Sequence, residues 1–504
     1  MPIVLIFDCG ATNTRTIALD EKGKILAAHH IASATKTGAE SADYHIWDFE
    51  EICDKLFECA RHVVVELTHH HYDIQDIIGI SVTTFGVDGA PFDRDGKQIY
   101  PIISWKCPRT IPVMQNIERY FDLETLYTRN GVGLYSFNTL FKLLWLKQNQ
   151  ADVYQRMDKF VFISSMITQR LTGVFSTDKT MAGTSMLTNL QSGNWDNEIL
   201  SVLELNKTHF PPMIEAGQPI GELQADIARL MGLPSGIPVI SCGHDTQFAI
   251  FGSGAKPNQP VLSSGTWEIL MARTAKAEPH FSLINQGLTT EFDAKTDHFT
   301  PGVQWLGSGV MEWVGKLFYT DVRNTALSDA AYYETIIREA EAVTLGSGGV
   351  EWHGNFNNTD DFSHSGKIAG LSLHTQRAQI YRAALEYMAY QLKRGLTTLE
   401  QVSHFQASSL ICVGGGSKNR LWNQIRADVL GLPIEIVDVA EATVLGAAMF
   451  TFAGAQYYQT IEIAQQQMQP QRKQILPSEK SQAYQQWLAD YIKHDANDNG
   501  VTKC

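Results

Sequence analysis

Apolar residues near the start of the chain fall in short runs separated by a polar turn. Residues 3–7 are continuously apolar and rich in β-branched side chains, which predicts a buried strand. A polar turn that contains glycine covers residues 8–15, and residues 16–19 return to a strand-like pattern. The first twenty residues are therefore predicted to form a β-hairpin with a polar tip.

The turn of this hairpin carries groups that suit phosphate binding. Gly10 lets the backbone turn tightly. Small and polar residues follow it and bring donors next to exposed backbone N–H groups, namely Ala11, Thr12, Asn13 and Thr14. Asp8, at the strand end, is placed to hold Mg²⁺ directly or through water. An ordinary hairpin with a polar turn is the alternative.

The same pattern recurs about half a chain later. Residues 260–272 again read as strand, turn and strand, with Ser264, Gly265 and Thr266 in the turn. Two hairpins of this kind, one in each half of the chain, suggest two similar domains that close on one nucleotide.

Two further strands end in candidate site residues. Residues 77–82 predict a buried strand that runs into Gly86 and Asp88, at the kind of sheet edge where sites form; a plain β-turn is the alternative. Residues 236–243 are strand-like and are followed by His244 and a helical pattern. Asp245 therefore lies at a strand-to-helix junction, as a helix cap or as a carboxylate fixed in a cleft.

Other candidates come from single side chains and from one glycine-rich turn. Trp105 offers a flat apolar face for a sugar and Arg109 can donate to several hydroxyls, although both residue types also serve in packing. The strand at 410–413 leads into Gly414, Gly415 and Gly416, a turn that admits a flat ligand close to the backbone. Neither a dinucleotide fingerprint nor a P-loop occurs.

Composition narrows the class of protein. A chain of 504 residues is too long to fold around a single hydrophobic core, so two or more domains are predicted. The formal net charge of −14, with no basic block, argues against nucleic acid and against an anionic membrane as partners. It leaves the oligomeric state open.

The seven scattered cysteines show no Cys-x-x-Cys spacing and suit free thiols in a reducing compartment. The N-terminal apolar run is too short for a signal peptide, and no run approaches the ~18 apolar residues of a membrane span. A cytoplasmic location is predicted.

Two longer motifs resemble a known family. Residues 137–146 are similar to the first signature of the FGGY carbohydrate kinases, and residues 366–371 with 379–386 are similar to the second. The resemblance covers nearly the whole chain. It implies an α/β fold of two actin/hexokinase-like (ribonuclease H-like) domains with a catalytic cleft between them. The implied boundaries are 1–248 for sugar, phosphate and the catalytic base, 249–455 for the nucleotide, and 456–504 for a helical tail.

The resemblance also implies a role for each candidate. Asp245 would take the proton from the sugar hydroxyl, and Asp8 would help place Mg²⁺ or another divalent cation. The phosphates of ATP would be held by Gly10, Ala11, Thr12, Asn13, Thr14, Arg15, Ser264, Gly265 and Thr266. Adenosine would be bordered by Gly414, Gly415 and Asn419, with Gln304 on the nucleotide side. The sugar would be faced by Gly86, Asp88, His244 and Thr246, together with Trp105 and Arg109.

Within the family, residues 83–89, 101–109 and 243–248 resemble most closely the kinases that phosphorylate L-fuculose at O1 in L-fucose degradation. Many members carry an aspartate where this chain has Cys107, so the resemblance implies one candidate sugar-binding carboxylate fewer here. The alternatives are a kinase for another ketose, such as L-rhamnulose or a pentulose, and a non-kinase ATPase or sugar-responsive regulator on the same fold.

Overall fold

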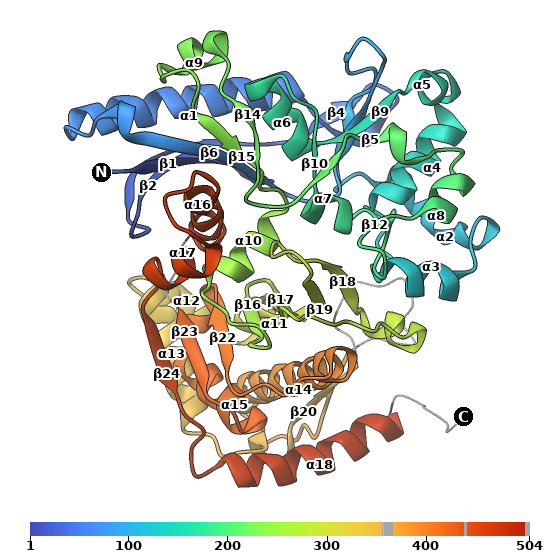
Figure 1. Cartoon of the computed structure of the whole chain (residues 1–504). Helices are drawn as coiled ribbons and strands as arrows, with labels where there is room; N and C mark the ends of the chain where they lie inside the picture. The colour runs from blue at the N-terminus through green and yellow to red at the C-terminus, as the bar shows by residue number, and fades with distance from the viewer. Residues whose placement is uncertain (355, 357–365, 438–440, 499–504) are drawn as a thin grey trace. The chain divides into compact units, whose positions relative to one another are not determined.

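The computed structural model describes residues 1–354, 356, 366–437 and 441–498 (Figure 1). The chain forms two compact units. Unit 1 contains residues 1–255, 273–301 and 441–469. Unit 2 contains residues 256–272, 302–440 and 470–504. Cys504 and the other five terminal residues of the predicted tail lie outside the described residues.

Unit 1 is built on a six-stranded sheet in the order β14-β15-β6-β1-β2-β3. All seven residues of β1 are buried, as expected for a strand covered on both faces. Helices α1 and α16 cover opposite faces of this sheet (Figure 1). The bounds are β1 (Ile3–Cys9), β2 (Asn13–Asp20), β3 (Ile25–Ala32), β6 (Ile77–Thr84), β14 (Pro219–Glu222), β15 (Pro238–Ile240), α1 (Phe49–His69) and α16 (Ala442–Gly454).

Three parallel strands of this sheet bring the candidate residues to one edge. β6 lies between β1 and β15 and runs parallel to both. Asp8 is the register partner of Thr83, and Thr84 forms a parallel bridge with His244. Because the carboxyl ends of parallel strands meet at one edge, segments distant in sequence converge there. The predicted hairpin is also present, since β1 pairs antiparallel with β2.

The remaining elements of unit 1 are shorter. Its other strands are β4 (Lys36–Gly38), β5 (Ser41–Trp47), β7 (Gly89–Phe92), β8 (Ile102–Ile103), β9 (Lys159–Phe162), β10 (Thr177–Asp178), β11 (Thr188–Asn189), β12 (Asn194–Trp195), β13 (Met213–Ile214) and β18 (Thr289–Phe292). Its other helices are α2 (Ile111–Gln115), α3 (Leu123–Asn130), α4 (Thr139–Asn149), α5 (Ala151–Arg156), α6 (Ile163–Thr172), α7 (Lys179–Gly183), α8 (Asn197–Val202), α9 (Ala225–Met231), α10 (Asp245–Gly252) and α17 (Ile461–Gln467).

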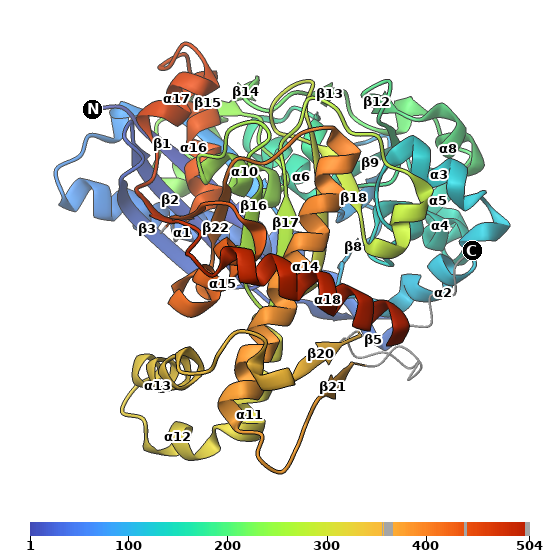
Figure 2. The same ribbon diagram turned by 90° about the horizontal axis from the view of Figure 1, so that it is seen from below.

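Unit 2 contains the second predicted hairpin, formed by β16 (Val261–Ser264) and β17 (Trp267–Met271). In its larger sheet the strands follow the order β19-β17-β16-β22-β23-β24, and β20 pairs separately with β21. The long helix α14 (Arg377–Ser403) packs against α11, α13 and α15, and Figure 2 shows it along its length. The other bounds are β19 (Phe299–Leu306), β20 (Glu351–His353), β21 (Lys367–Ala369), β22 (Leu410–Val413), β23 (Ile434–Val437), β24 (Arg472–Ile475), α11 (Ser308–Phe318), α12 (Thr320–Thr325), α13 (Asp329–Glu341), α15 (Arg420–Leu430) and α18 (Ser481–Asp498).

The compact units divide the chain differently from the predicted boundaries. Residues 273–301 and 441–469, expected in the C-terminal domain and tail, belong to unit 1. Close packing of α16 on α10 explains the second segment. A Cβ on Gly446 would lie 2.0 Å from the Phe248 carbonyl oxygen, so the two helices touch through glycine. The tail is also not wholly helical, because β24 pairs antiparallel with β23.

Candidate active site

Asp8 lies at the carboxyl end of β1 and is almost fully buried. Its Oδ1 accepts a hydrogen bond from the Thr83 hydroxyl at 2.9 Å. Its Oδ2 accepts from Arg15 Nε at 2.9 Å and also from Nη2. Arg15 in turn donates through Nη1 to Glu441 Oε2 at 2.7 Å. Burial alone would lower the pKa of Arg15, but Asp8 and Glu441 raise it, so the guanidinium stays charged.

The tip of the first hairpin is a tight turn in which Gly10 N donates to the Asn13 carbonyl at 2.9 Å. Ala11, Thr12 and Asn13 are partly or fully exposed. Thr14 is different, because its side chain is buried and its hydroxyl lies 2.6 Å from that of Ser33. The structure therefore leaves residues 10–13 accessible to a ligand and gives Thr14 a partner within the protein.

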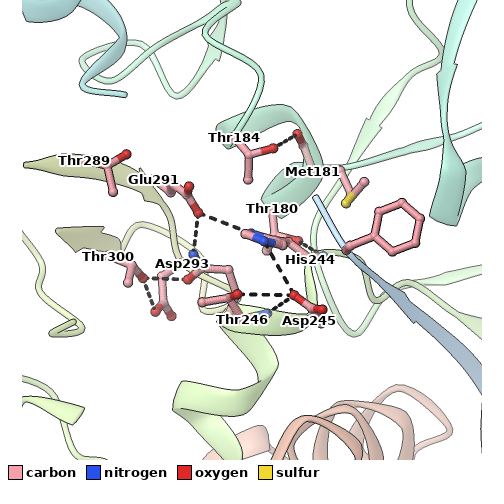
Figure 3. Close-up of polar contacts among 12 residues, drawn as sticks. Thr180, Met181, Thr184, His244, Asp245, Thr246, Thr289, Glu291, Asp293 and Thr300 are labelled. Atoms are coloured by element: carbon pink, nitrogen blue, oxygen red, sulfur yellow. Dashed lines mark hydrogen bonds and ion pairs between the residues drawn. The ribbon is translucent and has the colours of Figure 1, made fainter. Parts of the chain in front are cut away.

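Asp245 is the first residue of α10 and follows His244, the N-cap (Figure 3). Its Oδ1 accepts from Thr246 N at 2.6 Å and from the Thr246 hydroxyl at 3.2 Å. No hydrogen bond in the described part of the chain uses Oδ2, and the side chain is 32% exposed. Desolvation raises the pKa of Asp245, Asp8 adds to this rise, and His244 opposes it. The carboxyl is thus anchored by one oxygen and free at the other.

The backbone of His244 is fixed from the neighbouring helix α7. Its N–H donates to the Thr180 hydroxyl at 2.9 Å. Thr180 donates through its own hydroxyl to Asp178, which also accepts from the Ser241 hydroxyl at 2.7 Å. Asp178 is buried, and burial raises the pKa of its carboxyl. This chain of bonds holds the junction between β15 and α10 in place.

Two residues that the sequence analysis did not single out complete this cluster. Glu291 of β18 places Oε2 3.2 Å from His244 Nδ1, and the same oxygen accepts from Gln247 Nε2 at 2.9 Å (Figure 3). The side-chain amide oxygen of Gln247, Oε1, accepts from the Thr300 hydroxyl at 2.7 Å. Glu291 sits in an unremarkable Thr-Thr-Glu-Phe segment 46 residues after Asp245. No local signal in the sequence marks it.

Asp88 is more deeply enclosed than a substrate contact would require. Its Oδ2 accepts from Trp47 Nε1 at 2.7 Å and from the Trp105 N–H at 3.1 Å. Its Oδ1 accepts from the Lys142 ammonium, and the Asp88 side chain has no exposed surface. A sugar hydroxyl would have to displace one of these donors. Gly86 instead gives room to the His244 ring, since a Cβ there would lie 2.9 Å from Nε2.

Trp105 and Arg109 have contrasting environments. Trp105 is partly exposed, with Phe137 packed edge-on at a ring separation of 6.5 Å. The Arg109 guanidinium is buried between the rings of Tyr44 and Trp145, at 4.1 and 4.8 Å from their centroids. It also donates through Nε to the Cys107 sulfur at 3.0 Å. Trp105 is therefore open to a ligand, whereas Arg109 is engaged in packing.

In unit 2, the turn of the second hairpin rests on a buried ion pair. The Ser264 hydroxyl donates to Glu268 Oε1 at 2.8 Å, and Trp305 Nε1 donates to Oε2 at 2.9 Å. Arg426 pairs with Glu268, and neither side chain is exposed. The turn also meets the start of α11, because Gly307 N donates to the Thr266 carbonyl at 2.8 Å. Gly265 N donates to the Trp267 carbonyl at 3.1 Å and closes the turn.

The glycine-rich turn lies directly beside this hairpin. Gly414 adopts φ 88° and ψ 179°, a conformation open essentially to glycine alone. A Cβ on Gly416 would lie 2.1 Å from Ser264 Oγ, whereas a Cβ on Gly415 would meet nothing within 4 Å. Asn419 caps α15 by accepting from Trp422 N at 3.1 Å, and its amide donates to Tyr381 OH at 3.3 Å. Gln304 lies on β19, paired with Ile269 and half-buried.

The donor set of unit 1 fits a metal ion that arrives with a nucleotide. Among the described residues no group of three or more His, Cys, Asp or Glu side chains could hold a metal ion. Mg²⁺ prefers hard oxygen ligands and commonly takes one or two carboxylates, with phosphates and water supplying the rest. Asp8 provides such a carboxylate at the sheet edge. A carboxylate that can accept a proton, such as Asp245, is a further group that phosphoryl transfer to a hydroxyl needs.

Comparisons with known sequences identify the class to which this arrangement belongs. The FGGY family of carbohydrate kinases, N-terminal domain, matches residues 3–252, and the C-terminal domain of the same family matches residues 261–455. The chain belongs to the FGGY family of carbohydrate kinases. It is 62% identical over 479 residues to an L-fuculokinase from Haemophilus influenzae, which covers 95% of this chain and 100% of that protein. It is 45% identical over 477 residues to the L-fuculokinase of Escherichia coli, covering 94% and 97% of the two chains.

Solved structures confirm the predicted fold. A ligand-bound xylulose kinase from Lactobacillus acidophilus matches with a TM-score of 0.85 at 20% identity, covering 100% of this chain and 99% of that chain. The chain therefore has the two-domain α/β fold of FGGY kinases. Among the described residues no helix is both long and apolar enough to cross a membrane.

Proposed function

We propose that this protein phosphorylates L-fuculose at O1 with ATP and releases L-fuculose 1-phosphate. The main support for this type of reaction is the position of Asp245 at the carboxyl ends of three parallel strands. One of its carboxylate oxygens is anchored by Thr246, and the other is free. The substrate rests on the 62% identity to an L-fuculokinase. The domain boundaries and functions stated above, and a cytoplasmic location, remain predictions.

Asp245 is the proposed base of this reaction. Phosphoryl transfer passes through a loose transition state, so the base mainly orients the hydroxyl and accepts its proton late. An Asp245 carboxylate anchored by Thr246 through Oδ1 presents Oδ2 to the hydroxyl. The residues proposed to contact the sugar are His244, Thr246, Gly86 and Trp105. Asp88 and Arg109 are proposed to position these neighbours and not to contact the sugar, because both side chains are buried and held by other protein groups.

Each unit is proposed to contribute contacts to the nucleotide, from the first hairpin in unit 1 and from the second hairpin and the glycine-rich turn in unit 2. The accessible residues at the hairpin tips are proposed to contact phosphate oxygens, namely residues 11–13 of the first hairpin and residues 265–266 of the second. Arg15 adds a charged guanidinium. Gly415, with open space at its Cβ position, leaves room for adenosine next to Asn419. Bound Mg²⁺ would neutralise phosphate charge, and Asp8 is the residue proposed to hold it, directly or through water.

An assay of ADP release separates the candidate functions. The purified protein is given Mg-ATP with L-fuculose, L-rhamnulose, L-ribulose, D-xylulose or glycerol. The highest kcat/KM with L-fuculose supports the proposal. Equal or better turnover of another ketose reassigns the substrate and keeps the kinase mechanism. ATP turnover that no sugar stimulates overturns the kinase proposal and favours an ATPase or regulator.

A further inference from the structure

His244 lies between two carboxylates (Figure 3). Its Nδ1 is 3.2 Å from Glu291 Oε2, and its Nε2 is 3.6 Å from Asp245 Oδ1. Both are ion-pair distances and not hydrogen bonds, because Nδ1 has no hydrogen-bond partner among the described residues and Nε2 lies 3.6 Å from its carboxylate oxygen. Two carboxylates this close to the ring stabilise the imidazolium relative to the neutral imidazole. The geometry therefore favours the charged ring.

Hydrogen bonds from neighbouring residues fix the orientation of the Glu291 carboxylate. Gln247 is fully buried and donates to Glu291 Oε2 at 2.9 Å, while its own carbonyl accepts from Thr300. On the far side of the ring, Gly86 leaves space that a Cβ would fill. The ring of His244 thus lies between Gly86 and the Glu291 carboxylate, which accepts a hydrogen bond from Gln247.

The charged groups around His244 and Asp245 favour the charged form of the imidazole. Burial by itself lowers the pKa of His244, but Glu291, Asp245 and Asp178 raise it above its ordinary value. Desolvation raises the pKa of Asp245 and Asp8 adds to this rise, whereas His244 and the hydrogen bonds from Thr246 lower it. Without a charged His244, Asp245 would lose the ion-pair partner that opposes the rise in its pKa.

We propose that Glu291 is a positioning residue that holds His244 as an imidazolium against Asp245, so that the base stays ionised and presents its free oxygen to the substrate. The inference rests on the proposed kinase function for its catalytic consequence. The charge state of His244 does not depend on it, which allows the two to be tested separately.

The first test measures the titration of His244 in the full chain without substrate. The protein has 16 histidines, so ¹⁵N-histidine labelling is combined with His244→Gln to assign the signal. We expect His244 in the wild-type protein to titrate above an ordinary histidine. Glu291→Gln should lower the midpoint by about one pH unit or more, because an opposite charge at this distance is lost. An unchanged midpoint would overturn the inference whatever the protein catalyses.

The second test measures how kcat and KM for the ketose depend on pH. Glu291→Gln should move the acid limb of kcat/KM upward by about one pH unit, since a neutral His244 no longer favours the ionised form of Asp245. Glu291→Asp, which keeps the charge, should recover part of that shift. The matched control is Glu118→Gln, which removes one carboxylate from an exposed position of unit 1 and should leave the limb unchanged.

A double-mutant cycle distinguishes positioning from simple loss of packing. Once His244→Gln has removed the imidazole, adding Glu291→Gln should cause no further shift of the acid limb. Additive shifts of the acid limb would contradict the inference that Glu291 acts on Asp245 through His244. If the wild-type protein phosphorylates none of the ketoses, the proposed function fails, and the titration experiment alone decides the inference.

Discussion

The Lys142 ammonium donates to Asp88 inside unit 1, where neither side chain has more than 2% of its surface exposed. Lys142 also donates to the Val87 carbonyl at 3.0 Å, and the Thr139 hydroxyl donates to that same carbonyl at 2.8 Å. Val87 adopts a positive φ of 65°, which is strained for a β-branched residue. Helix α4 therefore holds both a buried carboxylate and a strained turn at the end of β6.

Removing the cation of this pair should destabilise the protein strongly. Lys142→Met leaves the Asp88 carboxylate buried without its cation, and we expect a loss of about 3–5 kcal/mol in the free energy of unfolding. Urea unfolding followed by circular dichroism measures it. The exposed Lys24→Met is the matched control and should change stability by no more than about 0.5 kcal/mol. Adding Asp88→Asn to Lys142→Met should restore part of the loss; no restoration would contradict the pairing.

Removing the proposed base should affect turnover far more than binding. Asp245→Asn should lower kcat by roughly 10²–10⁴, the usual worth of a positioned acid or base, while the KM for ATP stays near that of the wild-type protein. Steady-state kinetics with L-fuculose and Mg-ATP measure both constants. Asp43→Asn, an exposed residue in the same unit, is the control for loss of one negative charge. A kcat near the wild-type value would remove Asp245 from the role of base.

The pH dependence of turnover should reflect the environment of Asp245. Desolvation and Asp8 raise its pKa above the ordinary value of 3.8. Protonation removes the lone pair that accepts the substrate proton, so activity is lost as pH falls through this raised value. The acid limb of kcat/KM is therefore expected above pH 3.8. A profile that remained flat below that pH would contradict the assignment.

The sequence predicted the elements whose signals are local. Both hairpins could be recognised because an apolar strand, a small polar turn and a second strand follow one another directly, as in β1 and β2. The junction at Asp245 was recognisable for the same reason, since a strand-like run changes there to a helical pattern. The glycine-rich turn after β22 is another such case.

The environments of the candidate side chains could not be predicted, because they depend on residues far away in the chain. Asp88 meets Lys142 from a helix 54 residues later, and Glu291 reaches His244 from a strand 47 residues later. Arg109 is a plausible sugar ligand by residue type, but Tyr44 and Trp145 enclose it. The position of residues 441–469 in unit 1 likewise follows from contacts of α16 with α10 and β6.

Two adjacent glycines in the turn after β22 separate a structural role from a ligand-binding role. A Cβ on Gly416 would lie 2.1 Å from Ser264 Oγ, whereas a Cβ on Gly415 meets open space. Gly416→Ala should therefore force the hairpin and the turn apart and lower stability by about 1–3 kcal/mol, the usual cost of overpacking. Gly415→Ala should change the free energy of unfolding by less than about 1 kcal/mol.

The same pair tests the proposed adenosine site through its effect on ATP. If adenosine borders Gly415, the added methyl group occupies ligand space, and the KM for ATP should rise roughly tenfold while the KM for the ketose stays unchanged; a loss of about 1.4 kcal/mol in binding gives that factor. Urea unfolding and steady-state kinetics on both variants provide the two readouts. Normal stability together with an unchanged KM for ATP in Gly415→Ala would place adenosine elsewhere, because the open space beside this residue would then serve no ligand.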